Sequence, residues 1–464
     1  MKTEFSFKYY LHTLDCKFQM KILLINTPRS PHNSILEHAP DEAKKFIHKK
    51  LIGPPLGLLT LAAAVPNHDV IVWDTKGEYD LNPNSPTLED MVTQLIEKHK
   101  PDVVGTTVIT SEFYYGIKIL QTAKKCNPVI LTIIGGLHAT LCLEDFTDQS
   151  IDVICQGQSA HLFKNVVDAF EKNENLQSVS GIIINTKEGL KKTQSTSLCW
   201  DPANANYLVP NRSLLDRWKE TYVVGDAKYP STYMFTSLGC PYTCTFCSIW
   251  KEFEGKFMQR NIESIVNELK EMDYQIVRFS DANTIVNVKF INHLFDRIEE
   301  EGIRKTYIMD IRSDTAVKYP ELIEKLARNG LKVVICGFES FREEELKKYN
   351  KSASASLISK AIDVFHNNGI MLRGNYVIPA DYSFDDFKAI SHYANSHKVS
   401  YAGYTILTPM PGTSYYDEVK DEIIVHDLSK YNFFNCVLPT KLPLLEFYEE
   451  VGKLWLIKIG KNVI

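Results

Sequence analysis

The chain has 464 residues, 44% of them hydrophobic and 23% charged, which is ordinary for a globular protein of two or three domains. Its net charge of −5 argues against a nucleic acid as partner, and no apolar run is long enough for a membrane span. Ten cysteines without disulfide-like pairing and an N-terminus without the apolar core of a signal peptide predict a cytoplasmic protein. We expect residues 1–19, which precede the first clean strand, to be an extension or a misassigned start.

Strand and helix patterns alternate in the N-terminal third of the chain. Continuous apolar runs predict five buried parallel strands, at residues 21–25, 69–73, 102–109, 129–134 and 152–155. Helical patterns lie between them, at residues 56–64, 88–98 and 116–125. This alternation predicts a doubly wound parallel sheet, in which ligands bind outside the carboxyl ends of the strands.

Glycines and small polar residues gather at the predicted strand ends. The candidate binding residues of this sheet all lie there: Gly105, Thr106, Thr107, Gly135, Gly136, His138 and Gly157. Glycine lets a flat or bulky ligand approach the backbone closely. A generic sheet with tight turns would also contain such residues, and His138 is either a ligand contact or a polar turn residue.

Residues 166–230 are predicted to connect two domains. A short hairpin is expected at residues 181–189, and the Asn- and Pro-bearing segment 202–217 is expected to be a loop. Within an otherwise ordinary linker, Tyr207 and Trp218 are candidates for the edge of a cleft. The isolated cysteines are expected to be small core residues: Cys126, Cys142, Cys155 and Cys199.

Three cysteines then follow within eight residues, in the stretch Cys240-Pro-Tyr-Thr-Cys244-Thr-Phe-Cys247. Thiolates are soft ligands that suit iron–sulfur clusters or zinc. A structural zinc site closes with four ligands, whereas no fourth cysteine follows nearby. Three thiolates on a four-iron cluster would leave one iron open for a substrate. A chance grouping and a zinc site completed by a distant His or Cys are the alternatives.

The residues around these cysteines add a family resemblance. Gly239 directly before the first cysteine and Phe246 directly before the last match the signature of the radical S-adenosylmethionine (SAM) enzymes. The resemblance implies a [4Fe–4S] cluster on Cys240, Cys244 and Cys247, whose open iron binds the amino and carboxylate groups of SAM. One electron, from a donor such as a flavodoxin or ferredoxin, then cleaves SAM to a 5′-deoxyadenosyl radical. An anaerobic setting is expected.

With this motif downstream, the N-terminal third resembles the cobalamin-binding domain fused to many radical SAM enzymes. The matching pieces are the Gly-Pro-Pro-Leu-Gly-Leu segment from Gly53, the Val-Gly-Thr-Thr segment, the Gly-Gly-x-His turn and the turn at Gly157. The resemblance implies that the strand-end residues named above bind cobalamin. Two motifs depart from the pattern. The Asp-x-His-x-x-Gly motif is missing from residues 26–32, which implies no histidine below the cobalt, and Gly-x-Gly-Glu is replaced by Gln-Gly-Gln at residues 156–158.

The alternation resumes at residue 231. Six strands are expected, at residues 233–236, 276–279, 307–311, 333–336, 375–378 and 401–407. Amphipathic helical patterns separate them, as at residues 261–272 and 356–368. Six strand–helix units predict a partial (β/α)6 barrel with its active face at the carboxyl ends of the strands. The cysteine loop follows the first of these strands and therefore lies on that face.

The radical SAM resemblance assigns further contacts at these strand ends. Ser280 or Asp281 would meet the SAM amino group, although the usual Gly-Gly-Glu is absent there. Arg312 would meet the carboxylate, since a guanidinium forks onto carboxylates. Glu339, in a Gly-x-Glu-Ser match, suits the ribose hydroxyls or the amine, and Thr408 lies in a Thr-Pro-x-Pro-Gly-Thr segment that would frame the adenine. The alternative for each side chain is a surface cap or a salt bridge.

The predicted architecture is α/β. It has a Rossmann-like cobalamin-binding domain (20–165), a connector (166–230), a radical SAM partial barrel (231–415) and a short C-terminal helical extension (416–464). The extension either lines the cavity of an apolar substrate or packs outside the barrel. The predicted function is cobalamin-dependent methylation of an unactivated carbon in a small-molecule or lipid-like substrate. No residue stands out as a catalytic base, and radical abstraction needs none.

Three other functions are compatible with parts of the pattern. The nearest keeps the radical chemistry but performs cyclisation, oxidation or rearrangement of a lipid, tetrapyrrole or natural product without methyl transfer. Another is a non-catalytic protein that binds cobalamin or a metal. The last, methylthio transfer to RNA, is disfavoured because the N-terminal cysteines are scattered and the net charge is negative.

Overall fold

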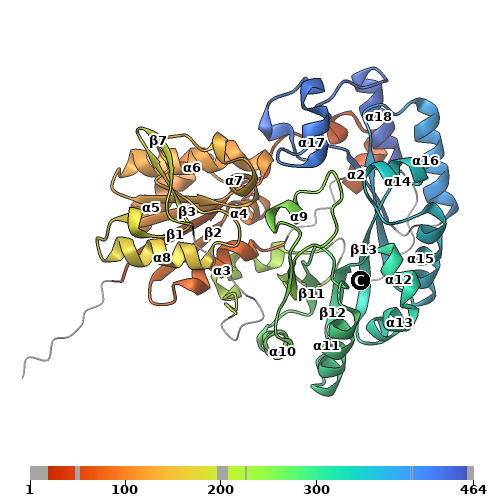
Figure 1. Ribbon diagram of the computed structural model, residues 1–464, viewed down its shortest axis with the longest axis horizontal. Coiled ribbons are helices and arrows are strands. Elements are labelled where there is room, and N and C mark those ends of the chain that lie inside the picture. Colours follow the sequence, from red (N-terminus) through yellow and green to blue (C-terminus); the bar gives the residue numbers. More distant parts are fainter. Residues whose placement is uncertain are drawn as a thin grey trace, which may run out of the picture.

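The computed structural model describes residues 19–47, 53–195, 207–224, 227–397, 399 and 401–456. Figure 1 shows two α/β units side by side, with the short helix α9 (Ile249–Glu252) between them. Cys199, residues 1–18 and residues 202–206 lie outside the described residues. In the described part of the chain, no helix combines the length and hydropathy needed to cross a membrane.

The N-terminal unit is the predicted doubly wound sheet. Its strand order is β2-β1-β3-β4-β5-β6-β7, with the first five strands parallel and the last two antiparallel. The strands are β1 (Lys21–Asn26), β2 (Asp69–Asp74), β3 (Val103–Thr107), β4 (Leu131–Gly135), β5 (Val153–Ile154), β6 (Ile183–Thr186) and β7 (Gly189–Lys192). The predicted hairpin is therefore confirmed, and it extends the edge of the sheet.

Helices cover both faces of this sheet. They are α3 (Leu56–Ala64), α4 (Thr75–Leu81), α5 (Leu88–His99), α6 (Phe113–Cys126), α7 (Leu137–Leu141) and α8 (Ala160–Glu171). One core lies under α3 and α8, and a second lies under α5 and α6. Cys142 and Cys155 are buried as predicted. The prediction for Cys126 is wrong, because this last residue of α6 is exposed to solvent.

The connector differs from the predicted loop. Residues Arg212–Thr221 form a 3-10 helix, η4, whose apolar face carries Leu215 and Trp218. The Trp218 ring is buried in the core under α3, and its Nε1 donates to Glu78 at 2.9 Å. Trp218 therefore does not edge a cleft, because the apolar face of η4 packs against β2 and α4.

The second unit is a six-stranded parallel sheet whose strands follow chain order. They are β8 (Ser231–Met234), β11 (Ile276–Phe279), β12 (Thr306–Asp310), β13 (Leu331–Glu339), β14 (Met371–Ile378) and β15 (Tyr401–Ile406). The outer helices are α10 (Ile262–Glu271), α11 (Val288–Glu300), α12 (Ser313–Lys318), α13 (Pro320–Arg328), α14 (Glu343–Lys348), α15 (Ala355–Asn367) and α16 (Phe384–Ser396). The largest core lies between this sheet and the helices, as a partial barrel requires.

Two further segments complete the fold. A small antiparallel pair, β9 (Ser237–Gly239) and β10 (Phe257–Gln259), encloses the cysteine loop and α9. The C-terminal extension contains α17 (Ser414–Val419) and α18 (Leu444–Leu454), and α18 packs outside the barrel against α16. Packing outside the barrel, one of the two placements considered for this extension, is the one observed.

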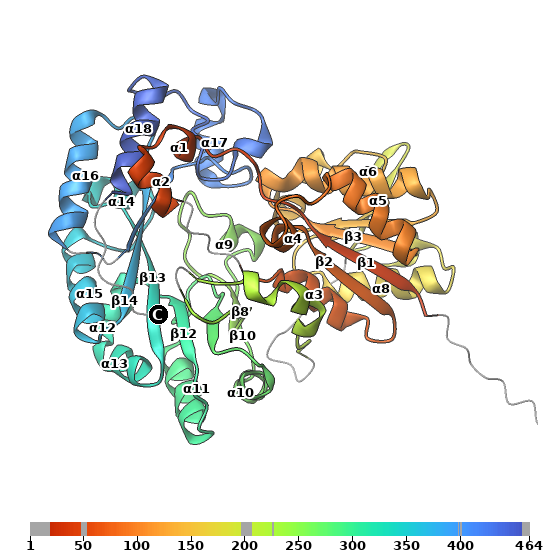
Figure 2. The same ribbon diagram turned by 180° about the vertical axis from the view of Figure 1, so that it is seen from behind.

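The chain after β1 crosses between the two units. Its helices α1 (Ser34–His38) and α2 (Asp41–Ile47) lie beside α18, as Figure 2 shows. Ser34 Oγ donates to Asn435 Oδ1 at 2.8 Å, and Asn432 Nδ2 donates to the His32 carbonyl at 2.6 Å. This segment, where the Asp-x-His-x-x-Gly motif is missing, therefore ties the first sheet to the C-terminal extension.

Candidate cluster and cofactor site

A cleft opens between the carboxyl ends of the N-terminal sheet and the start of the barrel. It holds about 1020 Å³ of space, part of it open to solvent. Six of the seven strand-end residues predicted from the sequence line it: Gly105, Thr106, Thr107, Gly135, Gly136 and Gly157. The opposite wall includes Phe235, Leu238 and Glu252 from the barrel unit, and Tyr207 from the connector, as predicted for this residue.

Two glycines in the wall have no packing neighbour that explains them. A Cβ at Gly57 in α3 or at Gly157 would meet nothing within 4 Å. Glycine in the middle of a helix costs about 0.5–1 kcal/mol relative to alanine, and Gly57, as the second residue of α3, carries only part of this cost. Gly157 and Gly136 also have a backbone reason to be glycine, because their φ angles are +63° and +103°, and a Cβ at Gly136 would lie 2.5 Å from Thr107 Oγ1. The open wall at Gly57 and Gly157 fits a large flat ligand such as a corrin.

His138 lies behind this wall and is not among the lining residues. Its side chain is fully buried, with Nε2 3.0 Å from Asp145 Oδ2 and Nδ1 3.3 Å from Thr110 Oγ1. Burial lowers the pKa of His138 to about 4, so the ring is neutral at neutral pH. Ligand atoms of His138, Cys142 and Asp145 lie within 4.8 Å of one another, close enough to hold a metal ion. A contact of His138 with cobalamin stays a prediction.

The three motif cysteines lie on the loop between β9 and α9. Cys244 is buried, whereas Cys240 and Cys247 are half-buried. Trp250 Nε1 donates to the Cys244 carbonyl at 2.9 Å, and Thr245 N donates to the Tyr349 carbonyl at 3.1 Å. These bonds fix the loop on the barrel's carboxyl-end face, where the sequence predicted it.

The donor set of the loop bears on the two metal hypotheses. Cys240, Cys244 and Cys247 are all free thiols on one loop. A structural zinc site needs a fourth ligand, whereas a four-iron cluster can be held by three thiolates that each bind a separate iron. The three cysteines therefore fit a cluster with one open iron.

Charged side chains surround Cys244. The Arg312 guanidinium lies 3.8 Å from the centre of the Tyr242 ring and pairs with Asp314 at 2.8 Å. Glu339 pairs with Lys351 at 2.8 Å. Arg312, Glu339 and Lys351 all act electrostatically on the Cys244 thiol, so two of the predicted SAM residues lie next to the cysteine loop.

Two features of this charged group were not foreseen. Glu339 has a φ of +64°, a left-handed conformation that is unfavourable for a side chain with a Cβ and that clusters at functional sites. Lys351 follows α14, twelve residues after Glu339, and no motif marks it. Only the fold brings Lys351 to Glu339, so no sequence pattern could have indicated this pairing.

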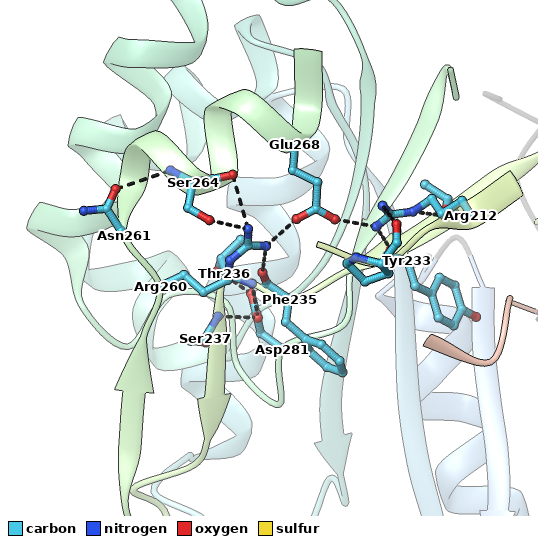
Figure 3. Close-up of polar contacts among 12 residues, drawn as sticks. Arg212, Tyr233, Phe235, Thr236, Ser237, Arg260, Asn261, Ser264, Glu268 and Asp281 are labelled. Atoms are coloured by element: carbon cyan, nitrogen blue, oxygen red, sulfur yellow. Dashed lines mark hydrogen bonds and ion pairs between the residues drawn. The ribbon is translucent and has the colours of Figure 1, made fainter. Parts of the chain in front are cut away.

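Asp281 holds the strand that leads into the cysteine loop. Its carboxylate accepts bonds from the backbone N–H groups of Thr236 and Ser237, both at 2.8 Å, and from Thr236 Oγ1 at 2.6 Å (Figure 3). Burial raises the pKa of Asp281 to about 6. The carboxylate therefore supports the segment that carries the cysteines, and its contact with SAM stays a prediction.

A buried ion network fixes the same segment from the other side. Arg260 donates to the Phe235 carbonyl at 2.8 Å and to Glu268 at 2.7 Å, and Arg212 donates to Glu268 at 2.6 Å (Figure 3). The Arg260 guanidinium also lies 3.3 Å from the centre of the Tyr207 ring. The network therefore joins two parts of the cleft wall, Phe235 and Tyr207.

Ser280 and Thr408 complete the set of predicted SAM residues. Ser280 Oγ is buried without a hydrogen-bond partner among the described residues, as are both polar side-chain atoms of Asn283. Thr408 Oγ1 donates to the Ile406 carbonyl at 3.0 Å. Ser280 and Asn283 thus offer unsatisfied groups at the end of β11, where a ligand would supply their partners.

Removal of the Asp281 carboxylate is expected to destabilise the entry to the cysteine loop. In Asp281→Ala, two buried N–H groups lose their acceptor, which costs about 3 kcal/mol in the free energy of unfolding. Asp281→Asn keeps an oxygen for both N–H groups and should lose less than about 1 kcal/mol. Urea unfolding followed by tryptophan fluorescence measures both values. Equal losses in the two variants would contradict the supporting role.

Two family models match most of the described domains. The radical SAM superfamily model matches residues 234–394, and the B12 binding domain model matches residues 47–167. These two segments contain the cysteine loop and the glycine-lined cleft, respectively.

Several curated proteins are similar over most of the chain. The Pyrococcus horikoshii protein "Uncharacterized methyltransferase PH0819" is 28% identical over 403 residues, 84% of each chain. "Hopanoid C-3 methylase" of Methylococcus capsulatus is 24% identical over 86% of this chain and 75% of its own. "Anaerobic magnesium-protoporphyrin IX monomethyl ester cyclase" of Rubrivivax gelatinosus is 27% identical over 75% of this chain and 64% of its own.

Solved structures share the fold. The radical SAM methyltransferase TsrM from Kitasatospora setae, with cobalamin and a [4Fe–4S] cluster bound, gives a TM-score of 0.65 at 15% identity, covering 87% of this chain and 75% of its own. The cobalamin-dependent SAM radical enzyme OxsB, in its apo form, gives a TM-score of 0.67 at 15% identity, covering 91% of this chain and 64% of its own.

Proposed function

Since this chain belongs to the radical SAM enzymes that carry a cobalamin-binding domain, we propose that it methylates an unactivated carbon of a small-molecule or lipid-like substrate. The names of two relatives, a methyltransferase and a methylase, support methyl transfer. The cyclase among the relatives keeps cyclisation without methyl transfer as the second candidate.

One observation carries the proposal. Helix α9 begins two residues after Cys247, and its last residue, Glu252, lines the glycine-rich cleft. Gln158, from the end of the N-terminal sheet, donates to Glu252 Oε1 at 3.2 Å. The cysteine loop and the cofactor cleft are therefore joined by one short helix, so a cluster and a corrin would lie side by side.

Each part of the site has a distinct task in this proposal. When bound, the [4Fe–4S] cluster supplies the electron that cleaves SAM, and cobalamin carries the methyl group. Cys240, Cys244 and Cys247 hold the cluster. Arg312 and Lys351 are placed to bind the SAM carboxylate, since they are the cations beside Cys244. The cleft walls exclude water and orient the corrin.

We keep 231–415 as the barrel and 416–464 as the extension, but we place the end of the first domain after β7, near residue 192 rather than 165, because α8 continues to Glu171 and β6 and β7 complete the N-terminal sheet. The chain then needs an external one-electron donor. A flavodoxin or a ferredoxin has a suitably low reduction potential for this role. We place the protein in the cytoplasm, where thiols such as Cys126 stay reduced.

The function is tested without knowledge of the substrate. The protein is reconstituted anaerobically with iron, sulfide and hydroxocobalamin, freed of excess cofactor, and incubated with SAM and a strong reductant. Both 5′-deoxyadenosine and S-adenosylhomocysteine are expected, the second only when cobalamin is present. Deoxyadenosine alone would favour the cyclase-like alternative. The absence of both products would refute an enzymatic role.

A further inference from the structure

The inner face of the barrel sheet carries three charged side chains that the proposed reaction does not use. Arg278 lies on β11, Asp310 on β12 and Arg373 on β14. Side chains alternate between the two faces of a strand. The flanking residues Phe279, Met309 and Leu372 belong to the core under the outer helices. The three charged side chains therefore face the inside of the barrel.

The charges in this group do not balance. Arg278 Nη2 pairs with Asp310 Oδ2 at 2.9 Å. Among the described residues, Arg373 has no carboxylate within 4.0 Å, and it makes one hydrogen bond, from Nε to Asn375 Oδ1 at 3.1 Å. Burial and the nearby Arg278 lower the pKa of Arg373 to about 10, which still leaves it charged at neutral pH. Among the described residues, this group thus contains two guanidinium groups and one carboxylate, which pairs with Arg278.

The neighbouring strand keeps room for the Arg373 guanidinium. A Cβ at Gly403 on β15 would lie 3.4 Å from Arg373 Nη2 and 2.6 Å from Asn375 Oδ1. Glycine at this position therefore allows Asn375 to hold Nε, while the Nη groups remain available. A guanidinium held in this way presents a planar fork to an oxyanion.

Arg373 is separate from the cations beside the cluster loop. Lys351 and Arg312 act on the Cys244 thiol, whereas Arg373 acts on Asp310 and Arg278. Glu339, next to Lys351, pairs in register with Tyr376, three residues further along β14 than Arg373. Arg373 is therefore set deeper in the barrel than the residues assigned to SAM.

We propose that Arg373, oriented by Asn375 beside the Arg278–Asp310 pair, binds an oxyanion of the substrate, a carboxylate or a phosphoryl group. The proposal rests on the proposed function, because it names a chemical class for the substrate of that site. An anion here would supply the counter-charge that the chain itself does not provide. Recognition at this depth would orient the rest of the substrate toward the cluster and the cleft.

The test measures anion binding to the cluster- and cobalamin-loaded protein by its thermal midpoint at constant ionic strength. The probes are inorganic phosphate, octyl phosphate, octanoate and, as the neutral counterpart, octanol. Phosphate, octyl phosphate and octanoate are expected to raise the midpoint of the unsubstituted protein, and Arg373→Gln should weaken their binding at least tenfold. Arg373→Lys should retain part of it. Arg328→Gln, at an exposed arginine on α13, is the matched control and should bind as the unsubstituted protein does.

Further readouts exclude a merely structural role and a role in SAM binding. Without anions, Arg373→Gln should melt at the same or a higher temperature, because it removes a half-buried cation that has no carboxylate partner among the described residues. A large decrease would overturn the proposal. SAM affinity should be unchanged in Arg373→Gln, whereas a tenfold loss with unaltered probe binding would assign Arg373 to the SAM carboxylate instead. Anion binding is measured without turnover. A failure of methyl transfer would therefore count against the proposed function and not against anion binding at Arg373.

Discussion

Replacement of Cys244 by alanine is expected to abolish cluster assembly and, with it, all cleavage of SAM. Cys244 is the most deeply buried of the three motif cysteines, and its carbonyl is tied to Trp250. Two remaining thiolates cannot hold a four-iron cluster with one open iron. We expect iron to fall from about four per chain to background and deoxyadenosine formation to fall at least about 1,000-fold, equivalent to about 4 kcal/mol. Iron analysis and chromatography of the SAM products give both numbers.

The control for this variant is Cys126→Ala. Cys126 is an exposed cysteine at the end of α6, so the substitution should leave both iron content and SAM cleavage unchanged. Stoichiometric zinc in the unsubstituted protein, lost in Cys244→Ala, would instead establish the zinc alternative. Full iron and activity in Cys244→Ala would show that the cluster lies elsewhere.

The sequence predicted those parts of the fold that leave a local pattern. Parallel strands buried on both faces read as continuous apolar runs, so β1 and β3 could be placed within two residues of their observed ends. Glycines at strand ends marked the cleft, since Gly135 and Gly157 line it. The cysteine loop was placed correctly because its motif is short and contiguous.

The remainder depends on contacts that leave no local pattern. Nothing near His32 in the sequence indicates that it accepts a bond from Asn432, four hundred residues away. Lys351 becomes part of the site only because the chain after α14 turns back to Glu339. Asp281 was assigned to SAM from its strand-end position, although its oxygens bind Thr236 and Ser237. Strand-end position identified the region of the site but not the partner of each side chain.

Filling the cleft at Gly57 is expected to remove cobalamin while leaving the cluster in place. Gly57 is exposed in α3, and a Cβ there meets nothing within 4 Å, so Gly57→Phe can be accommodated without displacing the chain. Its ring would occupy space that a corrin needs. We expect cobalamin affinity to fall at least about 100-fold, equivalent to about 2.7 kcal/mol. Corrin absorbance that remains after removal of free cofactor measures the loss, and iron content should be unaltered.

The matched control is Gly57→Ala, which adds a methyl group and gains helix propensity. It should retain cobalamin and raise the free energy of unfolding by at most about 0.5 kcal/mol, because alanine is the better helix residue but Gly57 lies in the first turn of α3. In Gly57→Phe, SAM should still yield deoxyadenosine, whereas S-adenosylhomocysteine should disappear. This separation follows from the architecture, since the cysteine loop belongs to the barrel unit and Gly57 belongs to helix α3 of the N-terminal unit. Retention of cobalamin in Gly57→Phe would mean that the corrin does not occupy this cleft. Loss of iron together with cobalamin would mean that the two sites cannot be loaded separately.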